Sequence, residues 1–275
     1  VITARSASVT PASGQTKVYG SADPILVGTL SGFLNLDGVT ATYSRATGET
    51  VLGGPYTISA TLSPSDVLSN YDITYNTANF VITARSASVT PASGQTKVYG
   101  SADPILVGTL SGFLNADGVT ATYSRAAGET VLGGPYKISA TLSPSDVLSN
   151  YDITYNTASF EITAKSASVT PASGQTKVYG SADPILVGTL SGFLNADGVT
   201  ATYSRVAGET VLGGPYDISA TLSPSDVLSN YDITYNAAGF VITTASTTLN
   251  LASSTNISVS GQYVTFTATV ASPTG

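Results

Sequence analysis

The sequence predicts an all-β chain of three tandem, small β-rich modules, either β-grasp-like or sandwich-like, arranged as an extended rod. The segment that begins Val1-Ile2-Thr3-Ala4 returns 80 residues later at Val81 and, altered, after another 80 at Glu161. Apolar and hydroxyl residues alternate with a period of two, which is the pattern of half-buried strands, and no stretch keeps a helical period for three turns. The copies follow one another without a Gly/Ser-rich or Pro-rich spacer, and such direct joints restrict bending.

The three copies are nearly identical. The first and second differ at four positions, and the second and third differ at six. Near-identity at a fixed period marks an array of modules rather than one globule. The sequence therefore predicts repeats at residues 1–82, 83–162 and 163–243, followed by a different segment at residues 244–275.

Each repeat is expected to contain six or seven short strands separated by turns rich in Gly, Pro, Asn and Asp. In the first copy the expected strands cover residues 7–10, 16–19, 25–30, 39–44, 56–62, 71–75 and 80–83. One helical turn is expected at residues 63–68, where Ser63 could cap the turn and Pro64 suits its first position.

The strand at residues 56–62 shows which side chains face inward. Alternation places Tyr56, Ile58, Ala60 and Leu62 on the buried face. The position between the first two is Thr, Lys and Asp in successive copies, and side chains of such different polarity cannot share a packed interior. We therefore expect residue 57 and its counterparts to face water.

Composition excludes most catalytic chemistry. The chain has no cysteine, histidine, tryptophan or methionine, so it lacks thiolates and the commonest metal ligand. Its net charge is −7 with no basic cluster, which argues against nucleic-acid or anionic-membrane partners, and no apolar run approaches the ~18 residues of a membrane helix. We expect no enzymatic activity and no cofactor. Because the chain begins with Val1, we interpret it as a piece of a longer, processed protein.

Two kinds of candidate site compete with simpler interpretations. In the first, the turn Asn35-Leu36-Asp37-Gly38 and its copies could offer oxygen ligands to calcium through Asp37, Asp117 and Asp197. Calcium takes about six to eight oxygens, often several carboxylates, whereas each turn supplies one, so we favour a turn and no metal.

The second kind is a covalent crosslink. Lys17, Lys97 and Lys177 recur inside a strand, and an amide bond from such a lysine to a nearby Asn or Asp is conceivable, but we favour an ordinary exposed lysine.

The tyrosines of each repeat could form a platform for sugars, but core packing explains most of them. Four of the five in the first copy, at positions 43, 56, 71 and 75, fall on the inward phase of their strands and are expected in the core. Tyr19 is the least certain of the five.

Four stretches of each repeat carry a resemblance to a known family. In the first copy they are Lys17-Val18-Tyr19-Gly20-Ser21-Ala22-Asp23-Pro24, Arg45-Ala46-Thr47-Gly48-Glu49, Pro55-Tyr56-Thr57-Ile58 and Asn70-Tyr71-Asp72-Ile73-Thr74-Tyr75. With these motifs the repeat resembles the MBG domain of the YGX type, which occurs in repeats on bacterial surface proteins and large adhesins. The resemblance implies a small β-rich, β-grasp-like domain used as a spacer or stalk, and it implies no catalytic residues.

The last segment resembles a different family. Two stretches, Thr247 to Leu251 and Ser260 to Val270, are similar to the opening strands of bacterial Ig-like repeat domains, so residues 244–275 are expected to be the incomplete N-terminal part of such a domain. Its second strand places Phe266 and Val270 on an apolar face that further strands would cover.

These observations predict a structural spacer or stalk segment of a large extracellular repeat protein, an adhesin-like protein of the cell surface. The alternative is a building block of a self-assembling extracellular filament or sheath. A carbohydrate-binding module ranks third, because neither tryptophan nor an exposed aromatic cluster is evident. The expected partners are neighbouring copies of the chain or other surface-protein domains, with surface glycans or proteins bound through parts outside this chain.

Overall fold

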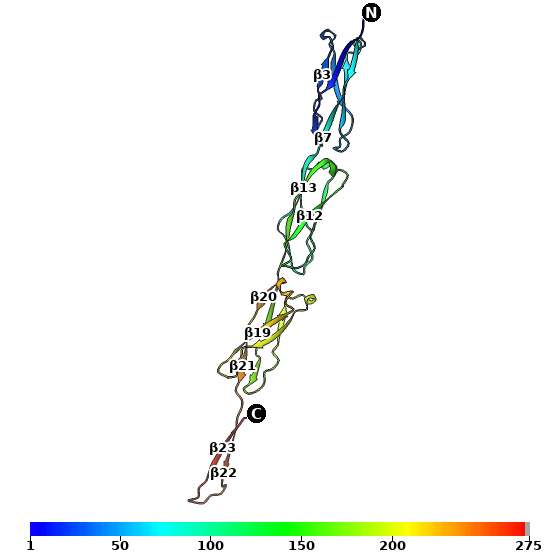
Figure 1. The fold of residues 1–275 in the computed structure, drawn as a ribbon. Coiled ribbons are helices and arrows are strands. Elements are labelled where there is room, and N and C mark those ends of the chain that lie inside the picture. Colours follow the sequence, from blue (N-terminus) through cyan, green and yellow to red (C-terminus); the bar gives the residue numbers. More distant parts are fainter. Residues whose placement is uncertain (273–275) are drawn as a thin grey trace. The chain divides into compact units, whose positions relative to one another are not determined.

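The computed structural model describes residues 1–272. Figure 1 shows the chain as strands joined by loops. By its internal contacts the chain divides into two compact units, and the second repeat contributes to both. Unit 1 comprises Val1–Gln95, Asp103–Ala127 and Tyr136–Phe160. Unit 2 comprises Thr96–Ala102, Gly128–Pro135 and Glu161–Gly275.

The first repeat has seven strands and two short 3₁₀ helices. They are β1 (Arg5–Pro11), β2 (Gln15–Val18), β3 (Gly28–Ser31), η1 (Asn35–Asp37), β4 (Thr40–Arg45), β5 (Tyr56–Ser63), η2 (Leu68–Asn70), β6 (Tyr71–Tyr75) and β7 (Ala78–Thr83). The predicted all-β, tandem-module class is confirmed. Six of the seven expected strands agree with the structure to within two residues at each end.

The later repeats follow the same order. The second contains β8 (Arg85–Pro91), β9 (Gln95–Val98), β10 (Gly108–Ser111), η3 (Asn115–Asp117), β11 (Thr120–Arg125), β12 (Tyr136–Ser143), η4 (Leu148–Asn150), β13 (Tyr151–Tyr155) and β14 (Ala158–Thr163). The third contains β15 (Lys165–Pro171), β16 (Thr176–Val178), β17 (Gly188–Ser191), η5 (Asn195–Asp197), β18 (Thr200–Arg205), β19 (Tyr216–Ser223), η6 (Leu228–Asn230), β20 (Tyr231–Tyr235) and β21 (Ala238–Thr243). A hairpin of β22 (Thr248–Ser253) and β23 (Phe266–Ala271) follows.

Two mixed sheets make up the first repeat. One has the order β3-β1-β6, in which β6 runs parallel to β1, and the other has the order β2-β7-β5-β4, in which β2 runs parallel to β7. The two sheets meet where β1 contacts β5. Two facing sheets fit the sandwich-like alternative, since a β-grasp fold would lay a helix across one sheet. The same strand orders recur in the second and third repeats.

The core lies between these sheets and follows the predicted alternation. Val9, Ile58 and Phe80 are fully buried, while Tyr56 and Leu62 are almost so. The variable position, Thr57 in the first copy, is exposed in all three repeats, as its changes in polarity required. The alternating sequence therefore builds the sandwich from apolar inner faces and hydroxyl-rich outer faces.

Two local expectations are wrong. The strand expected at residues 25–30 begins only at Gly28. The Val27 N–H donates to the Gln15 side chain in place of a neighbouring strand, whereas the Val27 carbonyl accepts from both the Ala12 N–H and the Gln15 side chain. The helical turn expected at residues 63–68 is also displaced. Ser63 still pairs with Thr40 as the last residue of β5, so the helical turn forms later, at η2. Among residues 1–272 no helix is long and apolar enough to cross a membrane.

Candidate functional site: the joint between repeats

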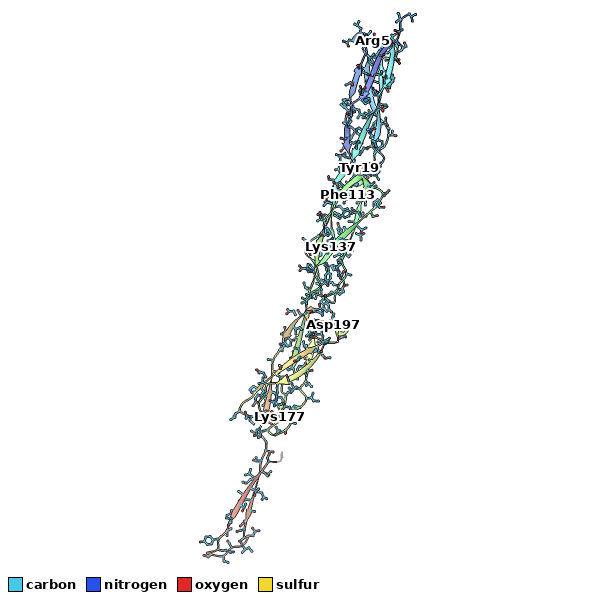
Figure 2. All side chains as sticks on the ribbon, in the orientation of Figure 1. Arg5, Tyr19, Phe113, Lys137, Lys177 and Asp197 are labelled. Carbon is cyan, nitrogen blue, oxygen red and sulfur yellow. The ribbon has the colours of Figure 1, made fainter. Side chains whose placement is uncertain are left out.

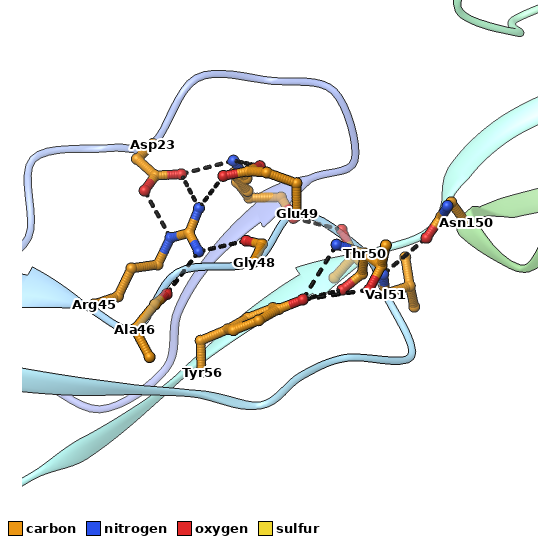
Figure 3. A network of polar contacts seen from close by, with 11 residues as sticks. Asp23, Arg45, Ala46, Gly48, Glu49, Thr50, Val51, Tyr56 and Asn150 are labelled. Atoms are coloured by element: carbon orange, nitrogen blue, oxygen red, sulfur yellow. Dashed lines mark hydrogen bonds and ion pairs between the residues drawn. The ribbon is translucent and has the colours of Figure 1, made fainter. Parts of the chain in front are cut away.

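Four charged side chains meet at one end of the first repeat, and Figure 3 labels three of them, Asp23, Arg45 and Glu49. Lys17 comes from β2, Arg45 ends β4, and Asp23 and Glu49 lie in the loops that follow these strands. The Lys17 ammonium lies 2.7 Å from Asp23 Oδ1 and also donates a hydrogen bond to Glu49. The prediction of an exposed lysine is wrong, because the inward phase of β2 buries Lys17 to 8% exposure and loop carboxylates approach it there. We call these four residues the ionic network.

Arg45 is the centre of the ionic network. Its Nε and Nη2 donate to the two oxygens of Asp23 at 2.6 and 3.0 Å, and Nη2 also donates to Glu49. Its Nη1 donates to the carbonyls of Ala46 at 3.0 Å and Gly48 at 2.6 Å. The five N–H groups of the guanidinium therefore all have acceptors, which a lysine with a single nitrogen could not match.

The Arg45 guanidinium also lies on the hydrophobic core. Its Cζ is 5.2 Å from the centre of the Tyr56 ring and 5.1 Å from that of Phe80. The Arg45 side chain is only 6% exposed. Arg45 thus joins the polar loops at this end of the repeat to the aromatic part of the core through cation–π contacts.

The charges of the ionic network hold one another ionised. Hydrogen bonds from Arg45 and then Lys17 lower the pKa of Asp23 to about 2. Burial lowers the pKa of Lys17, but the hydrogen bonds and charges of Asp23 and Glu49 together raise it above its ordinary value. An amide crosslink needs an uncharged amine that attacks a protonated acid. The ionic network opposes both conditions.

We therefore expect no crosslink between Lys17 and Asp23, nor between the equivalent residues of the other repeats. Each amide bond would release one water, so mass spectrometry of the intact chain should give the mass of the unmodified sequence. A deficit of one water that disappears in Lys17→Met would contradict this expectation and would show that the carboxylate and the amine react.

The ionic network also predicts sensitivity to acid. Because the pKa of Asp23 falls from 3.8 to about 2 on folding, the stabilisation is present above pH ~4 and is lost as the pH falls toward 2. The Asp23 side chain is 38% exposed, so solvent screening limits the loss to about 1 kcal/mol for the first repeat. Urea midpoints measured between pH 5 and 2 should fall, and Asp23→Asn should flatten this dependence. An equally steep fall in Asp23→Asn would assign the acid sensitivity to other groups.

The later repeats contain the same ionic contacts. In unit 1, Arg125 donates from Nε to Asp103 at 2.6 Å. In unit 2, Lys177 lies 2.7 Å from Asp183, and Arg205 donates to the same carboxylate at 2.7 Å. The arrangement is therefore a property of the module and not of one copy.

The first joint between repeats lies beside this network, inside unit 1. Strand β7 ends at Thr83 and β8 begins at Arg85, so one residue separates the two modules. The backbone N–H of Tyr19 donates to the Thr83 carbonyl at 2.9 Å, which holds the end of β2 against the connection. The ring of Tyr19 extends from the first repeat to the second.

Asp117 of the second repeat receives hydroxyl groups from both modules. Tyr19 Oη lies 3.2 and 3.1 Å from its two oxygens, and Tyr151 donates a shorter hydrogen bond to Oδ2. Burial, followed by the hydrogen bond to Asp117, raises the pKa of Tyr151 to about 12. Both tyrosines therefore remain hydrogen-bond donors at neutral pH, and the joint contains a Tyr–Asp–Tyr cluster with one member from the first repeat.

A second hydrogen bond crosses the joint from the loop that carries Glu49. The backbone N–H of Val51 donates to Asn150 Oδ1 at 2.9 Å, and Asn150 is only 3% exposed (Figure 3). The Tyr56 hydroxyl donates to the Thr50 carbonyl at 2.7 Å and accepts from the Thr50 N–H at 3.1 Å. A continuous chain of contacts thus runs from the core through the ionic network and this loop into the next repeat.

Apolar contacts complete the first joint. The rings of Tyr19 and Phe113 both contact Tyr151, with centroids 5.4 and 4.9 Å away; Figure 2 shows where these two side chains lie. Gly20 faces Leu114 so closely that a Cβ on the glycine would lie 2.4 Å from a leucine methyl group. The joint is therefore packed as well as hydrogen bonded.

This packing gives a matched pair of glycine substitutions. Gly20 and Gly14 have nearly the same backbone conformation, with φ of +76° and +74°, but a Cβ added at Gly14 would meet no atom within 4 Å, whereas one at Gly20 meets Leu114. Both Ala variants carry the backbone strain, about 1 kcal/mol, and only Gly20→Ala should add a steric cost of about 1–3 kcal/mol. Urea denaturation of the two variants measures the difference. Equal losses would show that Leu114 moves aside freely.

The second joint lies inside unit 2 and has the same construction. Tyr99 Oη lies 3.2 Å from both oxygens of Asp197, Tyr231 donates to the same carboxylate, and the Val131 N–H donates to Asn230 Oδ1 at 2.9 Å. Each joint therefore pairs a donor end, formed by a tyrosine and a valine N–H, with an acceptor head, formed by an aspartate and an asparagine.

The structure assigns a location to each predicted candidate. Asp117 and Asp197 accept tyrosine hydroxyls at the joints, whereas among residues 1–272 Asp37 accepts one only from Tyr71 of its own repeat. Within residues 1–272 no three acidic side chains gather as metal ligands would. Calcium at these turns stays an untested possibility that we do not favour.

The strand alternation predicted the burial of some tyrosines correctly and of others wrongly. Tyr56 and Tyr71 are buried and Tyr43 packs against the core, but Tyr75 is 53% exposed although its strand phase pointed inward. It is the last residue of β6, which is an edge strand of the three-stranded sheet, whereas its neighbour Val9 on the central strand β1 is fully buried. The sequence did not indicate Asn150 as a residue of the joint. Asn70 occupies the same position in the first repeat, and nothing in the sequence shows that Asn150 is buried and Asn70 exposed.

Comparison with known proteins gives one family. The sequence profile of the MBG domain (YGX type) matches residues 7–81, 87–161 and 167–241, which is most of the chain. No curated protein matches the chain. Among solved structures, the I9–I11 tandem of titin aligns with 87% of this chain and 100% of its own at 8% identity, but its TM-score of 0.25 is too low to carry an argument.

Proposed function

The chain belongs to the MBG domain (YGX type) family, and on this premise we propose that it is a structural spacer of a large extracellular, adhesin-like surface protein. Tandem copies of this domain are typical of surface-protein repeat regions, and all-β modules of this type are typically structural. In this proposal the chain performs no catalysis and separates other parts of its protein from the cell surface.

The observation that carries the proposal is the joint. Each junction has one residue between consecutive strands, Ala84 or Ala164, and each is bridged by a tyrosine hydroxyl, a backbone N–H and an aromatic contact. A flexible linker would let modules fold back on one another, whereas a short, bridged joint resists bending. Resistance to bending is the property that a spacer requires.

The polar residues of each repeat support this role over catalysis. The acids of the ionic network are bound by arginine and lysine, and Arg45 has no N–H group without an acceptor. Asp117 is bound by two tyrosine hydroxyls. These groups hold loops and joints in position.

Small-angle X-ray scattering of the chain tests the proposal. A spacer should have a radius of gyration well above the roughly 19 Å of a compact globule of this length. The double variant Asp117→Ala/Asn150→Ala removes both side-chain acceptors of the first joint but keeps every apolar core side chain, and should broaden the distance distribution. A compact radius, or a distribution that the variant leaves unchanged, would count against a spacer stiffened by its joints.

A further inference from the structure

The edge strand β4 of the first repeat has backbone groups without a partner. It pairs with β5 on one side, and within residues 1–272 no strand pairs with it on the other. The Ala46 N–H, just beyond β4, donates to the Thr57 carbonyl, and hydrogen-bonded pairs alternate with non-bonded pairs along an antiparallel ladder. The N–H and C=O groups of Ala41, Tyr43 and Arg45 therefore point away from β5, toward the open edge.

A groove of about 810 Å³ lies beside this open edge, between residues 23–26 and residues 41–49. Leu26 and Tyr43 border it and pack against the core, whereas Ile25 at its border is 90% exposed. The same groove lies in the third repeat between residues 183–186 and 201–205. Because the segments at residues 20–28 and 40–45 are identical in all three copies, we treat the groove as a feature of the module.

One end of the groove presents negative charge to solvent. The carboxylates of Asp23 and Glu49 are 38% and 64% exposed, whereas the side chains of Lys17 and Arg45 are only 5% and 6% exposed. Figure 3 shows Asp23 and Glu49 beside the Arg45 guanidinium. A ligand at this end meets the acids of the ionic network and not its cations, so a basic side chain is favoured there.

We propose that the groove binds an extended peptide segment of another protein by β-strand addition. The segment would extend the sheet β2-β7-β5-β4 by pairing with the outward backbone groups of β4, since an unpaired edge is a template for a further strand. Its alternate apolar side chains would cover Ile25, and a lysine or arginine at one end would approach Asp23 and Glu49.

A second copy of the chain fits the groove less well. The alternating strands of the repeats bury their apolar side chains and expose hydroxyl groups, as Ile58 and Ser59 of β5 illustrate. Strands β22 and β23 expose apolar side chains but contain no lysine or arginine. The chemistry of the groove therefore favours a basic, apolar segment from a different protein.

Two synthetic peptides serve as probes, acetyl-Lys-Lys-Val-Thr-Val-Thr-Val-amide and the same sequence reversed, because the direction of the added strand is open. Titration calorimetry of the full chain at low salt should show saturable binding of one of them. Replacing both lysines with glutamate should weaken the binding roughly tenfold or more, and added salt should reduce this difference.

A triple variant tests the place of binding. It exchanges the most exposed apolar residue of each groove for serine and should weaken binding of the probe about tenfold, since an apolar contact is lost at every groove. The substitutions are Ile25→Ser, Ile105→Ser and Ile185→Ser, at positions that are 90%, 91% and 92% exposed, so the fold should be unaffected.

The matched control is Val81→Ser/Val241→Ser. These valines are 41% and 42% exposed outside the groove, and the second repeat already has Glu161 at the same position. This variant should bind the probe as the unmodified chain does.

Amide hydrogen exchange followed by NMR distinguishes strand addition from simple apolar contact. The bound probe should slow exchange at the outward N–H groups of Ala41 and Tyr43 and of their equivalents, whereas Thr42, whose N–H already faces β5, should change little. Protection at β6 or β2 in place of β4 would overturn the proposal.

Absence of saturable binding of both probes at millimolar concentration would also overturn it, as would equal binding by the triple variant. Self-association of the chain alone that the triple variant abolishes would replace the foreign peptide with a second copy. The spacer proposal is independent of all these results, because it depends on the scattering of the chain without a ligand.

Discussion

Replacing Arg45 with leucine is expected to lower the free energy of unfolding of the first repeat by about 2–4 kcal/mol, because Arg45 is buried while the carboxylates that it binds are partly exposed. The leucine would leave Asp23 and Glu49 with only Lys17, and the carbonyls of Ala46 and Gly48 would lose their donor. The cation–π contacts with the core would be lost as well. Arg45→Lys keeps the charge but not the five donors, and it should cost roughly half as much.

The loss should extend beyond the first repeat. Glu49 and Val51 belong to the same loop, so freeing Glu49 also loosens the N–H group that Asn150 accepts. Hydrogen exchange can follow this effect, since peptides that contain Thr57 or Lys137 differ in sequence and distinguish the first and second repeats. Arg5→Leu is the control, because Arg5 donates only to the Gly32 carbonyl in an exposed position. Equal effects of the two substitutions would show that the ionic network stabilises the repeat no more than one exposed arginine does.

Asp117→Ala is expected to destabilise the chain by about 2–4 kcal/mol, and Asp37→Ala by only about 1–2 kcal/mol. The two aspartates occupy the same position in successive repeats and each accepts the hydroxyl of a tyrosine in its own repeat. Only Asp117 also accepts a hydroxyl from the preceding repeat. The first substitution leaves two partly buried hydroxyl groups without this acceptor, whereas the second leaves one.

The difference between these two variants measures the coupling across one joint. Urea denaturation gives the total loss, and exchange of the peptide containing Thr57 shows whether the first repeat is weakened when the substitution lies in the second. Asn150→Ala and Asn70→Ala form a parallel pair in which the first should be the costlier, because only Asn150 is buried and bonded across the joint. Equal losses within both pairs would mean that neighbouring repeats fold independently.

The fold was largely predictable from the sequence because apolar and polar side chains alternate along its strands. The inward placement of Tyr56, Ile58 and Leu62 follows from the period of two, and the exposure of residue 57 follows from its change of polarity between copies. The start of β3 was not predictable, since the Val27 N–H donates to the Gln15 side chain and not to a neighbouring strand.

The joints were harder to predict for a physical reason. The bridging hydrogen bonds connect residues 98 and 99 positions apart, beyond the reach of any local pattern. Asp37 and Asp117 were weighed as calcium ligands but favoured as turn residues, and no local pattern indicated that their carboxylates accept tyrosine hydroxyls. Lys17 was expected in solvent because one isolated lysine in a strand carries no sign of the acids that the following loops bring to it.

The joint also bears on how the number of repeats can change. Every module carries a donor end and an acceptor head of the same composition, so the deletion or duplication of one 80-residue unit recreates an equivalent junction at the new boundary. None of the positions at which the three copies differ is a donor or acceptor of the hydrogen bonds that cross the two junctions. Genetic gain or loss of whole units would therefore alter the length of the array and leave the chemistry of its junctions unchanged.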